Sequence, residues 1–296
     1  MSELVPKEGG RPQWSVFKAA LETRGFRPSR RFGQNFLLDE NMVRAIVRDA
    51  GVGPGDRVLE VGSGCGFLSL QLLRAGVDLV SVEVDARLVE ITRELLANEP
   101  RFRLVEGDVL ASKHVLAPTV LAALPLDAPW HLVSNLPYSV SGPVMACAAD
   151  LVNAPASMTV LVQKEMALRV AAQPATDDWG PLSVRLQVDY TTELVRDVPS
   201  GLFWPRPKVE SSVVRLTRRP EPWPVLERRA LSRLVDELFQ RRRQSLGRVL
   251  GDLCTPREVA REWIERAGLE PAMRAEDLDL ATLRRLVRAD PREPDR

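Results

Sequence analysis

Before residue 218, the apolar residues of the chain fall into short runs that glycine, proline or acidic residues interrupt. Such runs are typical of buried strands, whereas apolar residues three or four positions apart are typical of helices. Five runs predict strands, over residues 58–61, 79–84, 102–105, 130–133 and 158–162. Two alternating segments, 191–198 and 212–216, predict a sixth and a seventh strand. Five strands with crossover helices and a closing hairpin indicate a doubly wound α/β sheet.

The segment from residue 58 to residue 85 has the pattern of a strand, a glycine-rich turn, a helix over 67–73 and a second strand. The turn is Gly62-Ser63-Gly64-Cys65-Gly66, and glycine lets a ligand approach the backbone. Glu83 ends the second strand, where such folds place an acid that accepts hydrogen bonds from ribose hydroxyls. A dinucleotide fingerprint would have glycine at position 67, which is Phe67 here. The unit therefore favours a nucleoside without a pyrophosphate, most commonly S-adenosylmethionine, over a turn that serves packing alone.

Two further strands end in residues that can contact a ligand, because ligands of such sheets bind beyond the carboxyl ends of the strands. Asp108 follows the third strand, where it either accepts a hydrogen bond from a cofactor's adenine amine or caps the next helix. The fourth strand ends in Asn135-Leu136-Pro137-Tyr138. An amide oxygen, a proline carbonyl outside the β-ladder and an aromatic ring suit a planar base with an exocyclic amine. Taken alone, the tetrapeptide fits a proline-terminated strand with a buried tyrosine better.

The N-terminal part contains one short pattern with two interpretations. Arg30-Arg31 precedes Phe32-Gly33-Gln34-Asn35-Phe36-Leu37, a combination typical of a loop that covers a ligand. It is equally typical of the lead into a helix, with Asp39 as the N-cap of an amphipathic run over 42–47. Upstream, residues 14–23 predict a short helix.

Beyond the proline-rich linker 218–224, the apolar residues have helical spacing. They form three sets, Leu226/Ala230/Leu234/Leu238, Val259/Trp263/Ala267 and Leu283/Leu286/Val287. The first helix ends at Arg241-Arg242-Arg243, which predicts either a phosphate contact or a solvated helix end with cations at its negative pole. We predict three parts: a basic N-terminal extension over 1–31, an α/β domain over 32–218 and a helical domain over 219–296.

Composition indicates a soluble globular protein with an uneven distribution of charge. Of the 296 residues, 45% are hydrophobic and 27% are charged, and no apolar run approaches the ~20 residues of a membrane span. The N-terminus lacks the apolar core of a signal peptide, so we expect a cytoplasmic protein. The net charge is +1, but residues 1–31 carry +4, residues 32–200 carry −8 and residues 201–296 carry +5. Basic ends beside an acidic middle suggest contact with phosphate.

The cysteine and histidine content argues against a metal site. Cys65, Cys147 and Cys254 lie far apart in the sequence, and there are only two histidines. A zinc site needs four ligands that usually cluster, so we predict no metal and three buried, reduced thiols.

Together these motifs resemble those of the ribosomal RNA small-subunit adenine dimethyltransferases, from about residue 28 to residue 286. The matching segments include Phe32-Gly33-Gln34-Asn35-Phe36-Leu37, Glu60-Val61-Gly62-Ser63-Gly64, Val82-Glu83-Val84-Asp85, Gly107-Asp108, Asn135-Leu136-Pro137-Tyr138, Val162-Gln163-Lys164-Glu165, Phe203-Trp204-Pro205-Arg206-Pro207-Lys208-Val209, Phe239 with Arg242-Arg243, and Arg274-Ala275-Glu276 with Leu278. The resemblance implies a class I S-adenosylmethionine methyltransferase fold, with a Rossmann-like seven-stranded sheet and a small C-terminal helical domain. It also implies dimethylation of adenine amines in small-subunit ribosomal RNA, presented in an assembling ribosomal particle.

The resemblance also assigns roles to single residues. Those it implies for binding S-adenosylmethionine are Gln34, Asn35, Leu37, Gly62, Gly64, Glu83, Asp108 and Asn135. Those it implies for holding the target adenine are Asn135, Pro137, Tyr138 and Phe203. Those it implies for RNA binding are Lys208, Arg241, Arg242 and Arg243. We expect the protein to be a monomer.

The chain departs from the family's pattern at four positions. The family usually has proline at Ser63, asparagine at Ser139, and lysine near Asp177 and at Gln244. Ser63 leaves the glycines of the turn in place, whereas the last two changes remove positive charge from the surface that is expected to face RNA.

Three other functions remain open. An adenine methyltransferase for large-subunit RNA is the nearest, although the helical tail with Arg274-Ala275-Glu276 favours the small subunit. Amino-methyltransferases for DNA or protein glutamine usually have Asn-Pro-Pro-Tyr, where this chain has Leu136. A ribosome-assembly factor without activity is the third, and the intact glycine turn, Glu83 and Asn135 argue against it. The lack of a cysteine near Pro137 argues against methylation of a pyrimidine carbon.

Overall fold

The computed structural model describes residues 21–23, 25–29, 32–124 and 128–292. Most of the helix predicted over 14–23 lies outside these residues, as does the pair Arg30-Arg31. The chain divides into two compact units. The first runs to Ala167 and also takes Glu193–Thr217, whereas the second combines Leu168–Thr192 with the chain from Arg218 onward. The predicted domain boundary at residue 218 is one of the crossings between units, but the sequence pattern did not separate the segment 168–192.

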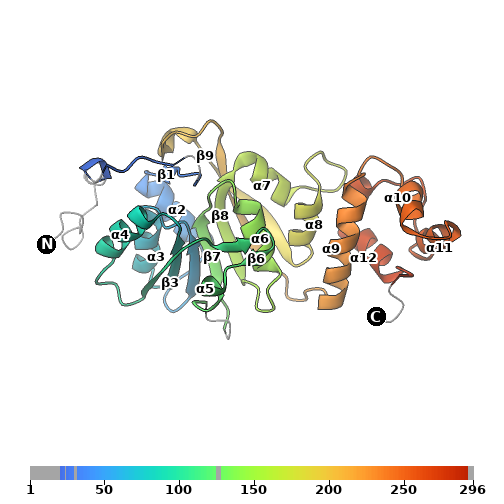
Figure 1. Ribbon diagram of the computed structural model, residues 1–296, viewed down its shortest axis with the longest axis horizontal. Coiled ribbons are helices and arrows are strands. Elements are labelled where there is room, and N and C mark those ends of the chain that lie inside the picture. Colours follow the sequence, from blue (N-terminus) through green and yellow to red (C-terminus); the bar gives the residue numbers. More distant parts are fainter. Residues whose placement is uncertain (1–20, 24, 30–31, 125–127, 293–296) are drawn as a thin grey trace. The chain divides into compact units, whose positions relative to one another are not determined.

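The first unit is organised by a seven-stranded sheet with the strand order β4-β3-β2-β7-β8-β11-β9 (Figure 1). Its strands are β2 (Arg57–Val61), β3 (Asp78–Glu83), β4 (Phe102–Glu106), β7 (His131–Asn135), β8 (Ser157–Gln163), β9 (Tyr190–Val198) and β11 (Ser211–Arg218). The five strands β4, β3, β2, β7 and β8 are mutually parallel, and β11 runs antiparallel to β8. All seven predicted strands are confirmed to within two residues at each end.

The strand order reverses between β2 and β7, because the chain builds β2, β3 and β4 outward and then returns to pair β7 with β2. At such a switch point the loops that follow the two strands diverge and leave a crevice at their carboxyl ends. The glycine turn after β2 and the Asn135 segment after β7 both border this crevice.

Helices connect and cover the strands of this unit (Figure 1). They are α2 (Glu40–Ala50), α3 (Phe67–Arg74), α4 (Ala86–Leu95), α5 (Pro118–Leu121), α6 (Ser141–Ala149) and the first half of α7 (Lys164–Ala171). The predicted cap of α2 is confirmed, because Asp39 Oδ1 accepts a hydrogen bond from Met42 N at 2.7 Å. Gly51, in the left-handed region with φ of 65°, ends that helix.

Two short antiparallel pairs were not predicted from the sequence. β1 (Phe36–Leu37) pairs with β10 (Phe203–Trp204), which follows the 3₁₀ turn η1 (Ser200–Leu202). β5 (Leu110–Ser112) pairs with β6 (Val115–Leu116). The pair β1–β10 joins residues far apart in the chain, so no local sequence pattern predicts it.

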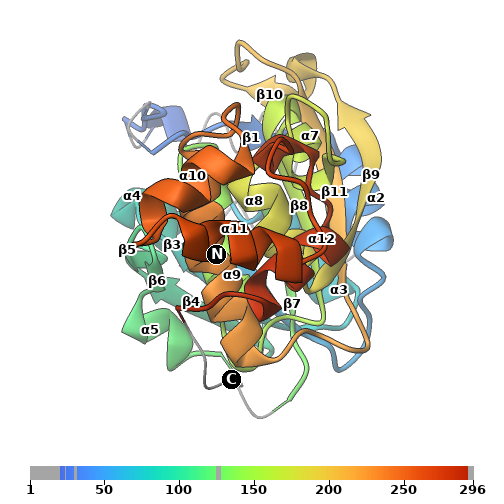
Figure 2. The same cartoon turned by 90° about the vertical axis from the view of Figure 1, so that its right-hand side faces the viewer.

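The second unit is a helical cluster with its own core. It contains α8 (Pro181–Gln187), α9 (Val225–Phe239), α10 (Leu246–Leu253), α11 (Glu258–Arg266), the 3₁₀ turn η2 (Ala275–Asp277) and α12 (Leu280–Arg288). In Figure 2, α9 to α12 lie against one another. Trp179 and Trp263 are fully buried there, and their ring nitrogens donate to the Leu278 and Leu286 carbonyls. The three predicted helices are confirmed, and α10 is an additional one.

In the part of the chain that the structure describes, no helix combines the length and apolarity needed to span a bilayer. Cys65, Cys147 and Cys254 are buried and free, as predicted.

Candidate active site

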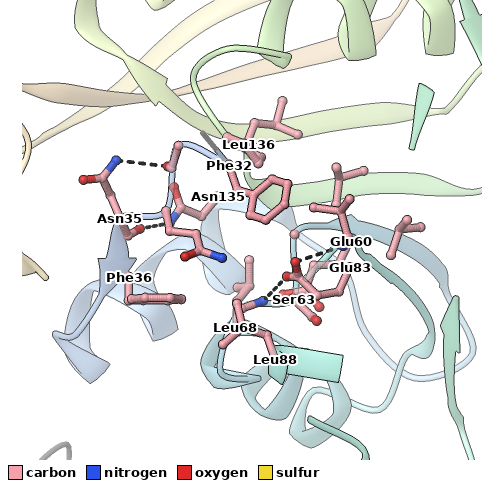
Figure 3. Close-up of a pocket in the computed structure, with 18 of the residues that line it drawn as sticks. Phe32, Asn35, Phe36, Glu60, Ser63, Leu68, Glu83, Leu88, Asn135 and Leu136 are labelled. Atoms are coloured by element: carbon pink, nitrogen blue, oxygen red, sulfur yellow. Dashed lines mark hydrogen bonds between the residues drawn. The ribbon is translucent and has the colours of Figure 1, made fainter. Parts of the chain in front are cut away.

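A cavity of about 330 Å³ lies at the carboxyl ends of β2, β3 and β7 (Figure 3). Ten of the residues predicted to bind cofactor or base line it: Gln34, Asn35, Leu37, Gly62, Gly64, Glu83, Asp108, Asn135, Pro137 and Tyr138. The segment 32–37 borders the cavity and also leads into the helix that Asp39 caps. The second interpretation is therefore confirmed, and a loop that covers a ligand stays a prediction.

Phe203 is the predicted base-holding residue that the cavity does not include. Its side chain is 4% exposed and belongs to the hydrophobic core. Its strand pairs with β1, where Phe203 stands opposite Leu37, and Trp204 stacks on Phe36 at 5.9 Å between ring centroids. Phe203 thus lies behind the segment that lines the cavity.

The turn after β2 requires glycine for its backbone conformation and, at Gly64, also for space. Gly62 and Gly64 have φ values of 78° and 56°, in the left-handed region. A Cβ at Gly62 would lie 3.4 Å from the Pro137 ring, and one at Gly64 would lie 3.2 Å from the Phe36 ring. The turn therefore presents bare backbone to the cavity.

Glu83 is a buried carboxylate held by backbone N–H groups (Figure 3). Its Oε2 accepts from Gly64 N at 2.9 Å, and its Oε1 accepts from Val84 N and Asp85 N at 2.9 and 3.0 Å. Burial raises its pKa, and these three bonds act in the opposite direction. A carboxylate has about four acceptor positions, so about one remains for a ligand hydroxyl.

Glu60, one strand away in β2, is a second buried carboxyl group that lines the cavity. The hydroxyls of Ser69 and Ser81 both donate to its Oε2 at 2.5 Å. Burial raises the pKa of Glu60 to about 7 against these bonds. In the sequence, Glu60 stands out only as part of the motif before the glycine turn, although an acid inside an apolar strand is a signal of this environment.

The side chain of Asn135 is oriented by the loop opposite it. Its Nδ2 donates to the Asn35 carbonyl at 3.1 Å, and Asn35 Nδ2 donates to the Gly33 carbonyl at 3.1 Å (Figure 3). Because the nitrogen of the Asn135 amide is engaged, its oxygen is the remaining acceptor of that side chain.

The two residues that end the Asn-Leu-Pro-Tyr segment are also fixed. The Pro137 carbonyl lies outside the β-ladder, as predicted, but it accepts from Val140 N at 3.1 Å and so closes a turn. The Tyr138 hydroxyl lies 2.6 Å from Ser211 Oγ, at the start of β11. Burial raises the pKa of Tyr138.

Gln34 and Asp108 differ in how much of their side chains is available. Gln34 Oε1 accepts from Ser29 N at 2.7 Å, and Gln34 Nε2 donates to Asp85 Oδ2 at 2.9 Å, so both ends of its amide are engaged. Asp108 is exposed, and its Oδ1 accepts from Leu110 N at 2.9 Å.

The residues predicted to bind RNA lie outside the cavity. Lys208 is exposed in the first unit, between β10 and β11. In the second unit, Arg241 pairs with Asp252, and Arg242 donates to the Asp177 carbonyl at 2.9 Å. Arg243 is exposed.

The sheet order, the glycine turn after β2 and the acid at the end of β3 define this protein as a class I methyltransferase. Solved structures share the fold. A dimethyladenosine transferase from Plasmodium falciparum superposes with a TM-score of 0.70 at 19% identity, over 84% of this chain and 94% of that one. The 23S rRNA methyltransferase ErmE superposes with a TM-score of 0.65 at 24% identity, over 86% of this chain and 98% of that one.

The chain belongs to the ribosomal RNA adenine dimethylase family, whose model matches residues 25–289. A protein of Synechococcus sp. named ribosomal RNA small subunit methyltransferase A is 41% identical over 262 residues, which cover 86% of this chain and 89% of that protein. A protein of the same name from Lactobacillus delbrueckii subsp. bulgaricus is 37% identical over 286 residues, which cover 93% and 95%. The family resemblance inferred from the motifs is thereby confirmed.

Proposed function

We propose that this protein uses S-adenosylmethionine to dimethylate adenine exocyclic amines in small-subunit ribosomal RNA within an assembling ribosomal particle. Membership of the ribosomal RNA adenine dimethylase family supports the reaction class, and the names of its relatives support the small-subunit substrate. The observation that carries the proposal is the orientation of Asn135, whose amide nitrogen is taken by the Asn35 carbonyl. This leaves an oxygen acceptor at the end of β7 for an amine.

The cavity fits the cofactor. Its volume of about 330 Å³ lies within the ~300–1,000 Å³ that is usual for small-ligand sites. Gly62 and Gly64 leave backbone uncovered, Glu83 retains an acceptor position for a ribose hydroxyl, and the exposed Asp108 can accept from an adenine amine. When bound, S-adenosylmethionine would supply the methyl group as an electrophile whose leaving group is a neutral thioether.

Asn135 and Pro137 would activate the target amine. An adenine amine is planar and weakly nucleophilic, since its lone pair is delocalised into the ring. Hydrogen bonds from its N–H groups to Asn135 Oδ1 and to the remaining lone pair of the Pro137 carbonyl would favour a pyramidal nitrogen. A neutral leaving group needs no acid, so position and oriented oxygens would supply most of the catalysis. The positive charge would pass from the sulfonium to the methylated nitrogen, which would then release one of its N–H protons to water.

Tyr138 would hold the target base by its face, a contact worth ~1–3 kcal/mol per base. The base must be outside its stack to enter, so the target is single-stranded or flipped. Phe203 is buried behind Leu37, and we propose that it supports β1 from the core while Tyr138 supplies the stacking ring.

Asn135→Ala tests the proposal. Methyl transfer from labelled S-adenosylmethionine to unmethylated small subunits should fall by about 10²-fold, as it does when an oriented catalytic group is lost. Cofactor affinity, measured by calorimetry, should change far less. Asn41→Ala, an exposed asparagine on α2, is the matched control and should behave as wild type.

The same assay separates the competing functions. Label in large-subunit RNA would favour the large-subunit alternative, and no label in either subunit would favour an assembly factor without activity. Near-wild-type turnover of Asn135→Ala would disprove the mechanism.

A further inference from the structure

Asp85 is a buried side chain, 5% exposed, that the proposed chemistry does not use. It caps α4, because Oδ1 accepts from Arg87 N at 3.1 Å and from Arg87 Nε at 2.9 Å. Its Oδ2 accepts from Arg87 Nη2 at 2.7 Å and from Gln34 Nε2 at 2.9 Å. Hydrogen bonding from Arg87 lowers the pKa of Asp85, which keeps the carboxylate ionised. The carboxylate therefore joins the start of α4 to the segment 32–37, across 51 positions of the chain.

Gln34 carries this connection into the segment that lines the cavity. Its Oε1 accepts from Ser29 N at 2.7 Å, so its side chain is fastened at both ends. The next residue is Asn35, whose carbonyl accepts from Asn135 Nδ2 at 3.1 Å. Asp85, after β3, is thus connected to Asn135, at the end of β7. The connection consists of the Asp85–Gln34 hydrogen bond, the peptide bond from Gln34 to Asn35 and the Asn35–Asn135 hydrogen bond.

Asp85 and Asn135, the two ends of this connection, have different roles in the proposed function. Asp85 donates its backbone N–H to Glu83, the acid proposed for the ribose, whereas Asn135 is the residue proposed for the target amine. If the segment moved away, the Asn135 amide would lose the carbonyl that fixes it. The Asn135 amide could then rotate so that its oxygen and nitrogen exchange places. It would present N–H donors to an amine that needs acceptors.

We propose that Asp85 and Gln34 are positioning residues, which hold the segment 32–37 so that the Asn35 carbonyl orients the Asn135 amide for methyl transfer. The inference rests on the proposed function and assigns Gln34 a positioning task in place of the direct cofactor contact implied by the resemblance. Packing supports the same segment, because Arg87 lies 4.7 Å over the Phe26 ring, which is 6.0 Å from the Phe36 ring.

The pair Gln34–Asp85 can be tested by exchanging the hydrogen-bond donor and acceptor between the two positions. Asp85→Asn places an amide where the Gln34 amide or Arg87 needs an acceptor, and Gln34→Glu places a carboxylate against Asp85. In the double variant Asp85→Asn with Gln34→Glu, the amide at position 85 can donate to the carboxylate at position 34, with the total charge unchanged. Each single variant should lower kcat at saturating S-adenosylmethionine and small subunits by roughly tenfold or more, and the double variant should recover most of the loss.

Hydrogen exchange of the amides over 32–38 is a second readout that needs no turnover. Exchange should accelerate in each single variant and slow again in the double variant. Gln34→Ala removes the bond without adding charge and should also accelerate exchange. Glu90→Gln, which removes an exposed charge from α4, is the control and should change neither readout.

Unchanged kcat and unchanged exchange in both single variants would overturn the inference. Faster exchange with unchanged kcat would also overturn it, because the pair would then serve stability alone. If the wild-type protein transferred no methyl group, the proposed function would fail. Exchange restored in the double variant would still support the hydrogen-bonded pair, and exchange left fast would refute it.

Discussion

The hydroxyl of Tyr138 lies 2.6 Å from that of Ser211, which has no exposed surface. Ser211 stands opposite Gln163 across the β8–β11 pair, so the bond ties the segment after β7 to a strand two places away. A tyrosine that must present its ring to a base gains from this anchor, because the ring is held before the base arrives.

Tyr138→Phe and Ser211→Ala should therefore slow methyl transfer by similar factors while cofactor affinity is unchanged. One net hydrogen bond is worth ~0.5–1.5 kcal/mol, which corresponds to roughly a two- to tenfold effect. The double variant should be no slower than either single one, since both remove the same bond. Ser212→Ala is the control, because the Ser212 hydroxyl donates to Asp197 and not to Tyr138. Additive losses would contradict the anchor.

Glu60 makes the stability of the protein depend on pH. Its pKa of about 7 in the folded state exceeds the ordinary 4.5, so the folded protein binds the additional proton between these values. Stability contributed by this group is complete below about pH 4.5 and is lost as the pH rises through about 7, by an amount on the order of 3 kcal/mol. Glu60→Gln keeps an oxygen for the Ser69 and Ser81 hydroxyls and does not titrate. Thermal unfolding at about pH 5 and pH 8 should show a smaller loss in the variant, and equal losses would refute the assignment.

We expect the hydroxyl of Ser63 to work against stability. Its hydroxyl is buried without a hydrogen-bond partner in the part of the chain that the structure describes. Such a group costs ~1–3 kcal/mol, so Ser63→Ala should raise the unfolding temperature. Ser69→Ala, which removes a hydroxyl bonded to Glu60, should lower it. A destabilised Ser63→Ala variant would show that the hydroxyl has a partner in solution.

At the scale of elements, the turn after α9 shows that three adjacent arginines are not equivalent. Arg241 pairs with Asp252, and Arg242 is held by the Asp177 carbonyl and by Glu276 at 3.7 Å. Arg243 is exposed. Two arginines of the turn therefore contribute to the internal structure of the second unit, and the third is the most available for phosphate.

Arg243→Gln should weaken binding to small-subunit RNA and make its salt dependence shallower by about one phosphate contact. Arg241→Gln should lower thermal stability more than RNA affinity, because it breaks an ion pair. Filter binding over a series of salt concentrations measures both. Equal affinity losses with equal salt slopes would mean that the internal ion pair does not restrict Arg241.

At the scale of the whole molecule, the two compact units suggest two separate binding contacts with the substrate. In our proposal, the cavity of the first accepts one unstacked adenine, and the basic residues of the second would contact the phosphates and the shape of the RNA rather than its sequence. A net charge of +1 provides little non-specific affinity. A particle that offers both contacts together raises the effective concentration of the target base.

Assembled small subunits should therefore be methylated with a higher specificity constant than protein-free small-subunit RNA. A short hairpin with the same adenines should be the poorest substrate of the three. Equal specificity constants on all three would show that the second unit does not select the particle.

The sequence by itself determined the strands, the glycine turn and ten of the residues that border the cavity. Strand periodicity, turn chemistry and helix caps are local, so seven strands and the Asp39 cap follow from neighbouring residues. The carboxyl ends of parallel strands meet at one edge of a sheet, so Glu83, Asp108 and Asn135 could be brought together from strand order alone.

Only the tertiary structure decided which partners fix the side chains of Asn135, Tyr138 and Gln34 at the cavity. The Asn135–Asn35, Tyr138–Ser211 and Gln34–Asp85 bonds span 100, 73 and 51 positions of the chain. Such partners depend on which strands are neighbours and on rotamers fixed by packing, and neither leaves a local pattern. For the same reason the sequence did not show that Phe203 packs in the core opposite Leu37. Nor did it show that the segment 168–192 groups with helices far along the chain.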